Sequence, residues 1–454
     1  MIEHKLQSGY INGLDRPYIF TYDGELLQLV PKEETSIKSY DSLRNKNIDC
    51  DVLEGDTIGF DKIFFLNCQL KVSLSGYIAK PAGYVCFCNG KRKFDVITFK
   101  GGILDYFYRP NHIIDEETTQ YDYDTGGAIL KLKTFDDTCK QAEVEVDGKK
   151  ATLTLSVTLP MEPLYMQINY NLGKPQSIFR LTFVEPIDIT EFRTIYMWIY
   201  NLMKFLNFRK DINMGKVELG KMNEENKIER IGYVYLNEKE KHDISNIDRI
   251  IGYHFVIDHI NELLQIVNKE DLNLLFIPQS EKEDKYLSAE KYMICCTSFE
   301  SVFNYVFPNA REKNIETSKE VKDDFLKYIE EKREEYKGKD RKKRKEFKKY
   351  ADMIEFLDFG LAEKFDYCNS KYETSITGYK NRILYGFNFN QEELEDLSSK
   401  FAEKRNMLAH SGVGDFENIH IFGYMLARVF IYVMLLDKAK VDSSMIIQAI
   451  DKIL

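Results

Sequence analysis

The stretch Ala142-Glu-Val-Glu-Val-Asp-Gly-Lys-Lys-Ala-Thr-Leu-Thr-Leu-Ser-Val157 decides the character of the first half of the chain. Apolar and polar residues alternate strictly on both sides of Asp147-Gly148, which is the pattern of strands with one buried face. Glycine supplies the positive φ that a two-residue turn requires, so Asp-Gly between alternating runs is a strong hairpin signal. We therefore predict a β-hairpin over residues 142–157.

Further strands are predicted on either side of this hairpin. Short runs rich in β-branched and aromatic residues occur at residues 61–68, 83–88, 94–99 and 178–184. Residues 190–207 differ, because their apolar positions recur at intervals of three and four, as on one face of a helix. We predict that residues 1–280 form a β-rich domain, built either as two packed sheets or as a barrel.

The period of the apolar pattern changes beyond residue 280. Helical spacing is found over residues 292–306 and again over residues 391–410, where the pattern stops at Ser411-Gly412. Residues 416–439 are apolar nearly all round, so this helix is expected to be buried. We predict an all-α domain over residues 281–454 and an α+β multidomain chain.

Two segments complicate this division. A charged insertion with little apolar content occupies about residues 311–350. Residues 236–285, which contain His254 and His259, are compatible either with a helix between the domains or with the last strand of the first domain. The position of the boundary within this segment is therefore left open.

Composition excludes several classes of protein. A net charge of −10 over 454 residues argues against a surface coated in positive potential for non-specific DNA binding. No run approaches the length of uninterrupted apolar sequence that a membrane span needs, and the first residues lack the apolar core of a signal peptide. A cytoplasmic protein without a membrane partner is expected.

Metal and nucleotide-cofactor chemistry is not expected either. The eight cysteines form no CxxC pair and have no neighbouring histidine in the sequence, which favours buried, reduced thiols over a zinc site. The chain has no P-loop, no GxGxxG before a helix and no HExxH motif. We predict no metal and no cofactor.

The helix predicted over residues 391–410 carries the most promising chemistry. Arg405 lies about 40° around the helix from the apolar Phe401, at the edge of the buried stripe, where an arginine needs an anionic partner. Asn406 and His410 are four residues apart and share a face. Arginine can hold a phosphate through a bidentate fork, and histidine can move a proton near neutral pH. These groups suffice in principle for metal-free RNA cleavage by the 2′-hydroxyl.

The same residues allow a plainer interpretation, in which Arg405 forms a structural ion pair and His410 satisfies carbonyl groups at the end of its helix. The Arg-x4-His spacing alone is weak evidence, because Arg249 and His254 repeat it. A glycine interrupts that second match and no helical stripe surrounds it, so we interpret it as a chance occurrence.

Several residues together resemble the HEPN superfamily, whose pattern is an arginine, a polar residue, and a histidine four to six residues after the arginine. Arg405-Asn406, followed by His410, fits this pattern. The upstream segment Ser375-Ile-Thr-Gly-Tyr-Lys-Asn-Arg382 is similar to the ApeA-like branch of the superfamily. Glu300 falls at an acidic position that HEPN domains often carry in their first long helix. A β-rich domain before a HEPN domain is also similar to the layout of ApeA anti-phage proteins.

This resemblance implies a metal-independent endoribonuclease that acts in abortive infection as a toxin against RNA once a phage is sensed. His410 would be the acid and base, Arg405 the phosphate-binding cation, Asn406 an orienting group, and Glu300 a partner of Arg405. A homodimer through the helical domain is implied, with the β-rich domain restraining activity until it recognises a phage component, expected to be a protein. The alternative is a catalytically inactive helical module for dimerisation or for RNA or protein binding.

A basic tract offers tentative RNA contacts. Residues 337–349 hold nine lysines and arginines against two acids, among them Lys342, Lys343 and Arg344. Such a run is either a solvated face, a partner for the acidic residues 330–335, or an arm that binds phosphate in a salt-sensitive way. Arg382 is a further candidate, either as a phosphate contact or as a structural ion pair.

Overall fold

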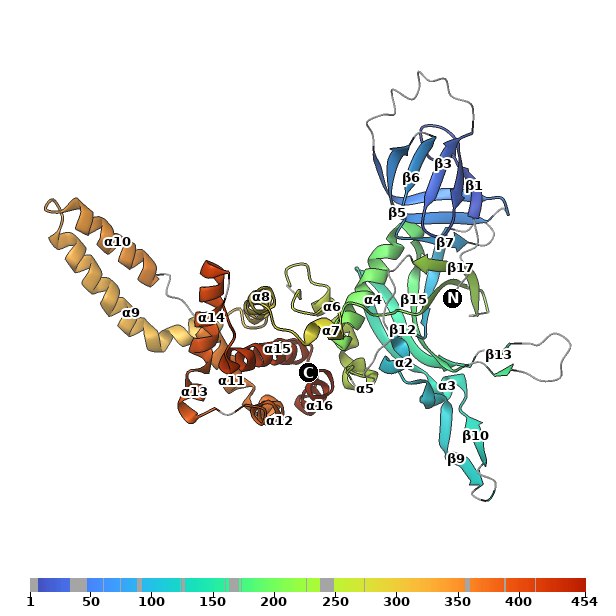
Figure 1. Cartoon of the computed structure of the whole chain (residues 1–454). Coiled ribbons are helices and arrows are strands. Elements are labelled where there is room, and N and C mark those ends of the chain that lie inside the picture. Colours follow the sequence, from blue (N-terminus) through green and yellow to red (C-terminus); the bar gives the residue numbers. More distant parts are fainter. Residues whose placement is uncertain are drawn as a thin grey trace. The chain divides into compact units, whose positions relative to one another are not determined.

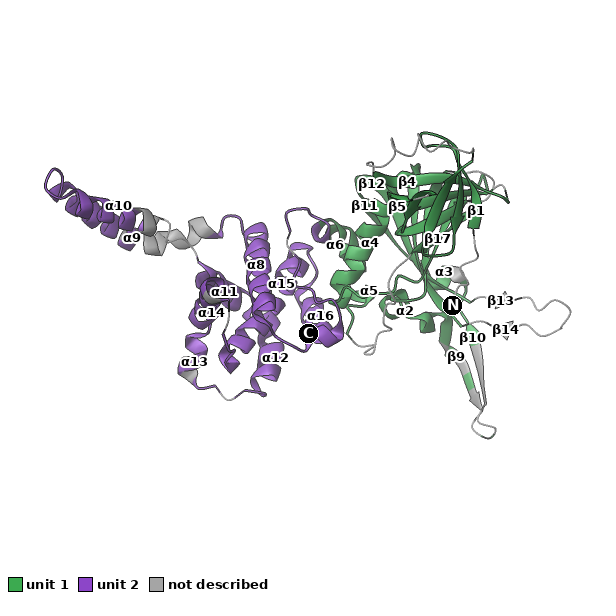
Figure 2. Ribbon diagram, turned by 45° about the horizontal axis from the view of Figure 1, so that its top comes forward, with its two compact units in different colours: residues 1–265 green, residues 266–454 purple. Residues whose placement is uncertain are grey.

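The structure is a computed structural model of the chain. It describes residues 7–454 except residues 33–46, 60, 74, 88–91, 123, 125–126, 160, 163–170, 173, 226, 237–248, 273, 356–359, 388 and 413. The chain divides into two compact units, a β-rich unit (residues 1–265) and a helical unit (residues 266–454), shown in Figure 2. The boundary predicted after residue 280 falls inside the helical unit, ahead of its first long helix.

Six strands of the β-rich unit close into a barrel (Figure 1). They are β1 (Gln7–Ile11), β2 (Tyr18–Tyr22), β3 (Leu27–Pro31), β4 (Ile48–Thr57), β5 (Lys62–Ser73) and β6 (Gly76–Ala79). The pairing order is β5-β4-β1-β2-β3-β6, and β6 pairs again with β5, which closes the ring. Inward-facing aromatic rings fill it, with Tyr22 in edge contact with Phe65 and Tyr84 at 5.3 Å between centroids in each pair.

An antiparallel sheet continues from the barrel through β5. Its further strands, in spatial order, are β7 (Gly83–Phe87), β17 (Ile228–Leu236), β16 (Lys216–Met222), β8 (Lys93–Lys100), β15 (Gln176–Asp188), β12 (Lys149–Thr158) and β11 (Lys140–Val146). Helix α4 (Phe192–Asn207) packs on this sheet, with Tyr196 centred 6.0 Å from Phe99 of β8. The β-rich prediction is confirmed, with a barrel and an open sheet sharing one continuous set of strands.

The hairpin that the sequence singled out is confirmed as β11 and β12. Val146 pairs with Lys149, and the two turn residues Asp147 and Gly148 have φ of 51° and 74°. A type I′ turn needs positive φ at both central positions, which explains the Asp-Gly pair. The other four predicted strands are β5, β7, β8 and β15, and the helix predicted over residues 190–207 is α4. Cys88, at the end of one predicted strand, lies outside the described residues.

Shorter elements complete this unit. They are α2 (Leu104–Phe107), η2 (Pro110–Ile113), β9 (Ile114–Asp122), β10 (Gly127–Leu132), α3 (Phe135–Thr138), β13 (Met161–Glu162), β14 (Asn171–Leu172), η3 (Ile189–Glu191), α5 (Tyr253–Val256), η4 (Ile257–His259) and α6 (Ile260–Val267). His254 and His259 therefore lie in helical turns, and the strand interpretation is wrong for the stretch that contains them. Residues 237–248 of the same segment lie outside the described residues.

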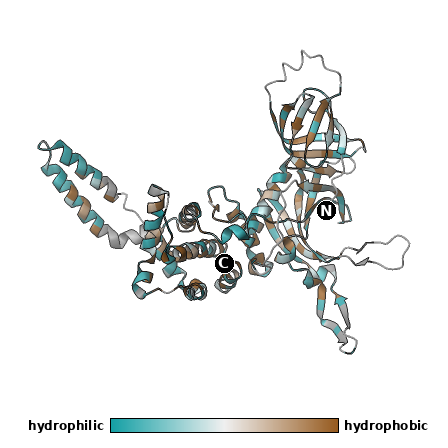
Figure 3. Cartoon of the chain, in the orientation of Figure 1, coloured by the Kyte–Doolittle hydropathy of each residue, from teal (hydrophilic) through white to brown (hydrophobic). Residues whose placement is uncertain are grey.

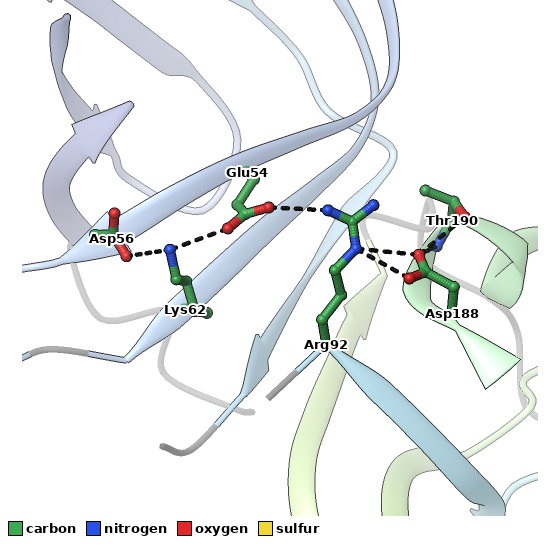
Figure 4. Close-up of polar contacts among 6 residues, drawn as sticks. All are labelled: Glu54, Asp56, Lys62, Arg92, Asp188 and Thr190. Atoms are coloured by element: carbon green, nitrogen blue, oxygen red, sulfur yellow. Dashed lines mark hydrogen bonds and ion pairs between the residues drawn. The ribbon is translucent and has the colours of Figure 1, made fainter. Parts of the chain in front are cut away.

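An ion-pair network joins the barrel strands to the open sheet (Figure 4). Lys62 lies 2.7 Å from Asp56 and 3.0 Å from Glu54, and Arg92 lies 3.1 Å from Glu54 and 3.0 Å from Asp188. Partial burial opposes ionisation of Asp188, but the Thr190 N–H and Arg92 outweigh it and lower the pKa of this carboxyl. Because the side chains are partly exposed, each ion pair contributes little to stability. The network mainly holds the barrel strands in position against the open sheet.

The helical unit is all-α, as predicted. It contains α7 (Glu281–Asp284), α8 (Ala289–Val306), α9 (Ala310–Glu335), α10 (Arg341–Glu355), α11 (Leu361–Lys371), α12 (Glu373–Leu384), α13 (Gln391–Glu395), α14 (Leu397–Ser411), α15 (Asn418–Lys438) and α16 (Ser443–Ile453). In its core, Phe365 of α11 is centred 5.0 Å from both Phe401 of α14 and Phe430 of α15. The single helix predicted over residues 391–410 is wrong in one respect, because it is interrupted at Asp396 (φ −84°, ψ 0°), between α13 and α14.

Two helical segments of this unit contrast in their hydropathy (Figure 3). The predicted charged insertion is helical, and α9 and α10 pair as a hairpin in which Tyr336 stacks on Phe347 at 5.7 Å. In contrast, α15 is apolar along most of its length and would be long enough to cross a membrane. It is a core helix instead, with 89% of its most apolar window buried, which confirms the prediction for residues 416–439.

Candidate functional site

Helix α14 holds the Arg-Asn-x-x-x-His motif in a defined position. Its apolar face packs into the core through Leu397, Phe401 and Leu408, which are at most 5% exposed. Gly412 ends the helix with φ of 67°, and its N–H donates to the Leu408 carbonyl at 2.9 Å. The stop predicted at Ser411-Gly412 is therefore confirmed, and this C-terminal cap fixes the last turn, in which His410 lies.

The structure brings Arg405, Asn406 and Glu300 together. A guanidinium nitrogen (Nη2) of Arg405 lies 3.9 Å from Oε2 of Glu300 on α8, and the other terminal nitrogen (Nη1) donates to Oδ1 of Asn406 at 3.1 Å. The side chains of Arg405 and Glu300 remain 38% and 29% exposed, so this pair sits at the surface edge of the core. A phosphate could reach the guanidinium without displacing buried residues.

Lys364 of α11 is a member of this group that the sequence analysis missed. Its ammonium lies 3.7 Å from Oε1 of Glu300, and its side chain is only 12% exposed. Glu300 thus has one cation at each carboxylate oxygen. No sequence pattern links Lys364 to the motif, because its position depends on how α11 packs against α8 and α14.

His410 is exposed, and its side chain leaves α14 in a different direction from that of Arg405. Five residues correspond to about 140° around a helix, so His410 and Arg405 of one chain do not share a face. His410 does share a face with Asn406, at about 40°. The Arg405 group and the histidine are therefore two adjacent surfaces of α14 within one chain.

The segment after His410 is anchored by a buried lysine. Lys404 is 3% exposed, donates to the carbonyl of Asp415, and lies 4.9 Å from the centre of the Phe416 ring. The following helix α15 is capped by His420, whose Nδ1 accepts the Glu417 N–H at 3.1 Å. Burial, and then Lys404, lower the pKa of His420, so this imidazole stays neutral and available as an acceptor.

A cysteine beside the group is not a nucleophile. Cys296 lies one helical turn before Glu300 and is buried. Burial, then the Cys295 thiol and the Glu300 carboxylate, raise the pKa of Cys296 well above its ordinary value, and Arg405 opposes them only in part. A thiol that stays protonated is unreactive, so acid–base chemistry at this surface rests on other side chains.

Arg382 lies apart from the Arg405 group and has a partner of its own. Its guanidinium is 3.0 Å from Asp451 of α16 and 5.1 Å from the centre of the Tyr379 ring. Helix α12 packs chiefly against α16 and α15. This geometry favours the structural-ion-pair interpretation of Arg382 over the phosphate contact.

Most of the basic tract lies on α10, with Lys337 and Lys339 in the turn before it, and the tract is mostly unneutralised. Arg344 is 3.8 Å from Glu334, and Lys343 lies 5.1 Å from the centre of the Tyr336 ring, whereas Lys342 is exposed. The acids of residues 330–335 pair mainly with cations next to them in sequence. Within the described side chains no ion pair involves Arg341, Lys342, Lys345, Lys348 or Lys349. The predicted pairing between the acidic and basic segments is therefore limited to Glu334, which lies 2.8 Å from Lys337 and 3.8 Å from Arg344.

Comparison with known proteins adds nothing to this geometry. No family model, no curated protein and no solved structure matches the chain. The resemblance to HEPN domains therefore rests on the motif residues and their placement.

Proposed function

We propose that the protein is a metal-independent HEPN-type endoribonuclease of the ApeA-like kind, acting in the cytoplasm in defence against phage. The observation that carries the proposal is the Glu300–Arg405–Asn406 group beside an exposed His410, on a helix whose end is fixed by Gly412. It offers a phosphate-binding cation and a titratable imidazole on adjacent faces of one helix, which are the two elements that this reaction needs.

The reaction assigns one task to each residue. An imidazole of His410 takes the proton of a 2′-hydroxyl, the oxygen attacks the adjacent phosphorus, and the bond from phosphorus to the 5′-oxygen breaks. The imidazolium then gives that proton to the leaving 5′-oxygen, so the products are a 2′,3′-cyclic phosphate and a 5′-hydroxyl. Arg405 stabilises the charge that develops on the phosphate, and Asn406 holds the guanidinium through its 3.1 Å hydrogen bond.

The different directions of Arg405 and His410 on α14 support a homodimer as the active form. In one chain these side chains lie about 140° apart, so a phosphate held by Arg405 is not faced by the histidine beside it. A second copy of α14 across a two-fold axis would supply a histidine to the arginine of the first, and the reverse. The β-rich unit would restrain this assembly until it binds a phage component, which we expect to be a protein.

The competing function is a silent helical module for dimerisation or for binding RNA or protein. The ion pair of Arg405 with Glu300 inside one chain is the observation that favours it. Against it, neither Arg405 nor His410 is buried, so both are open to a substrate.

The proposal is tested with purified full-length protein and total RNA in EDTA. Wild type is expected to cleave, and Arg405→Ala and His410→Ala are each expected to lose at least about 100-fold in rate, since general acid–base catalysis contributes about 10²–10⁴-fold. Lys371→Gln is the matched control, because Lys371 is a half-exposed cation of the same unit that pairs with Asp437. Cleavage that survives both alanine variants would place the active site elsewhere, and no cleavage by any form would favour the silent module.

A further inference from the structure

A cluster of aromatic rings in the β-rich unit is not explained by the proposed nuclease. Tyr108 follows α2, His112 lies in η2, and Tyr253 and His254 begin α5, a segment far away in sequence that lies beside α2 (Figure 1). The Tyr108 ring is centred 4.7 Å from both His112 and Tyr253, and His112 and Tyr253 are 5.4 Å apart. His254 continues the cluster at 5.7 Å from Tyr253.

The base of this cluster is rigid and its outer part is open. Tyr108 is 2% exposed, and its hydroxyl donates to the Thr138 carbonyl. His112 and Tyr253 are half-buried, and His254 is exposed. The cluster therefore presents ring surface to solvent from a fixed floor, which a hydrophobic core would not require.

Cations from separate elements lie near His112. Arg109 begins the turn that contains His112, and its carbonyl accepts the His112 N–H at 3.2 Å. The N–H of Lys133, after β10, donates to the carbonyl of Ile113 at 2.8 Å, which places Lys133 beside η2. Lys140 is the first residue of β11, and Arg109, Lys133 and Lys140 are all exposed.

The electrostatic environment of His112 agrees with this placement. Burial lowers the pKa of His112, and the charges of Lys133, His254, Arg109 and Lys140 lower it further. A positive field around a half-buried imidazole favours the approach of an anion.

Two carboxylates of α3 lie nearby, but the charges that act most strongly on His112 are those of Lys133, His254, Arg109 and Lys140. Asp137 of α3 is held by the backbone and hydroxyl of Thr134 in a capping box. Asp136 lies beside Cys139, whose pKa is raised by burial and then by this carboxylate.

We propose that Arg109, His112, Lys133, Lys140, Tyr253 and His254 form a nucleotide-binding site, which we call the ring–cation site. Lysine and arginine side chains would hold the phosphate, and the exposed faces of His112 and Tyr253 would stack against the base. The ligand is a nucleotide, either free or within a single strand of nucleic acid. This assignment is independent of the nuclease proposal, because it concerns another unit and another set of residues.

The test measures binding of two probes to full-length protein, a mononucleotide (ATP) and a fluorescent single-stranded DNA oligomer, which lacks the 2′-hydroxyl and cannot be cleaved by the proposed reaction. The Lys133→Gln, Lys140→Gln double variant is expected to weaken binding of whichever probe binds by about tenfold, with a smaller dependence on salt. Both lysines are exposed, so the double variant is expected to fold. His112→Ala removes one of the two proposed stacking surfaces and is also expected to weaken binding of that probe.

The matched control is the Lys80→Gln, Lys227→Gln variant, which changes two exposed lysines of the same unit that pair with Glu25 and Glu225. If ATP binds and the double variant weakens its binding, the ligand is a free nucleotide. If only the DNA oligomer binds and the double variant weakens its binding, the ligand is a single strand of nucleic acid. The proposal is overturned if neither probe binds, or if the double variant and the control bind equally well. None of these outcomes depends on cleavage of RNA.

Discussion

At the scale of single residues, the most informative side chain of the candidate site is Lys364, which shares Glu300 with Arg405. With one cation at each oxygen, Glu300 cannot neutralise both, and the group keeps an excess positive charge for a phosphate. Without Lys364, Glu300 and Arg405 would be a neutral pair. We infer that Lys364 acts as a positioning residue through Glu300 and does not itself need to touch RNA.

This role predicts the kinetics of one substitution. Lys364→Met keeps the length of the side chain and its packing near Phe303, but removes the charge, so KM for RNA is expected to rise about three- to tenfold with a smaller change in kcat. Lys371→Met, two turns further along α11, is the control and should leave both constants unchanged. A fall in kcat with an unchanged KM, or equal effects of the two variants, would rule out this role.

Cap and turn residues were readable from sequence because they act locally. Asp147-Gly148 needs only its own φ angles to form the hairpin, and Gly412 needs only the last turn of α14 to end it. In contrast, Lys364 approaches Glu300 only after α11 has packed on α8. Nothing in the one-dimensional pattern could have paired them.

At the scale of elements, a buried ion pair ties the central helix to its surroundings. Arg428 of α15 lies 3.0 Å from Asp284 of α7, and these side chains are only 9% and 10% exposed. Burial of a charge costs free energy, and that cost is no longer offset when the other member of the ion pair is removed. The pair therefore specifies how α7 docks on the core helix.

Substitution of the arginine should destabilise the helical unit. Arg428→Met is expected to lower its free energy of unfolding by about 3–5 kcal/mol, because the buried carboxylate of Asp284 loses its ion-pair partner. Arg382→Met, which removes the more exposed pair with Asp451, should cost less than about 1 kcal/mol. Urea unfolding followed by far-UV circular dichroism measures both.

The chain provides an internal reference for this experiment. Its single tryptophan, Trp198, lies in α4 of the β-rich unit, so tryptophan fluorescence follows the other unit. A shift of the dichroism transition without a shift of the fluorescence transition is the expected result. Equal stability of Arg428→Met and Arg382→Met would contradict a stabilising role for the buried pair.

The closure of the barrel could not be predicted from the sequence, because it depends on pairing between strands that are distant along the chain. The strands were recognisable by alternation, but the ring of six closes because β6 pairs with both β3 and β5. Neither packed sheets nor a barrel could be preferred from alternation, since both place every second residue inside. The break at Asp396 was missed because the apolar stripe continues in phase from Leu394 to Leu397.

At the scale of the whole molecule, the fold class and the two-part organisation were predictable from the change of period along the chain. The function was not predictable from periodicity, and the proposal depends on one short motif and its neighbours. Arg405, Asn406 and Glu300 do gather at one surface, which a chance motif would not require. Arg382 has its own partner, and most of the basic tract on α10 stays available for an anionic strand.

The central claim is that this surface cleaves RNA by attack of the 2′-hydroxyl without a metal. The most direct measurement is mass spectrometry of the ends formed when wild-type protein cleaves a defined RNA oligomer in EDTA. We predict 2′,3′-cyclic phosphate and 5′-hydroxyl ends, and no cleavage at a position whose 2′-hydroxyl is replaced by hydrogen. Fragments with 5′-phosphate and 3′-hydroxyl ends, or cleavage at the 2′-deoxy position, would contradict the account.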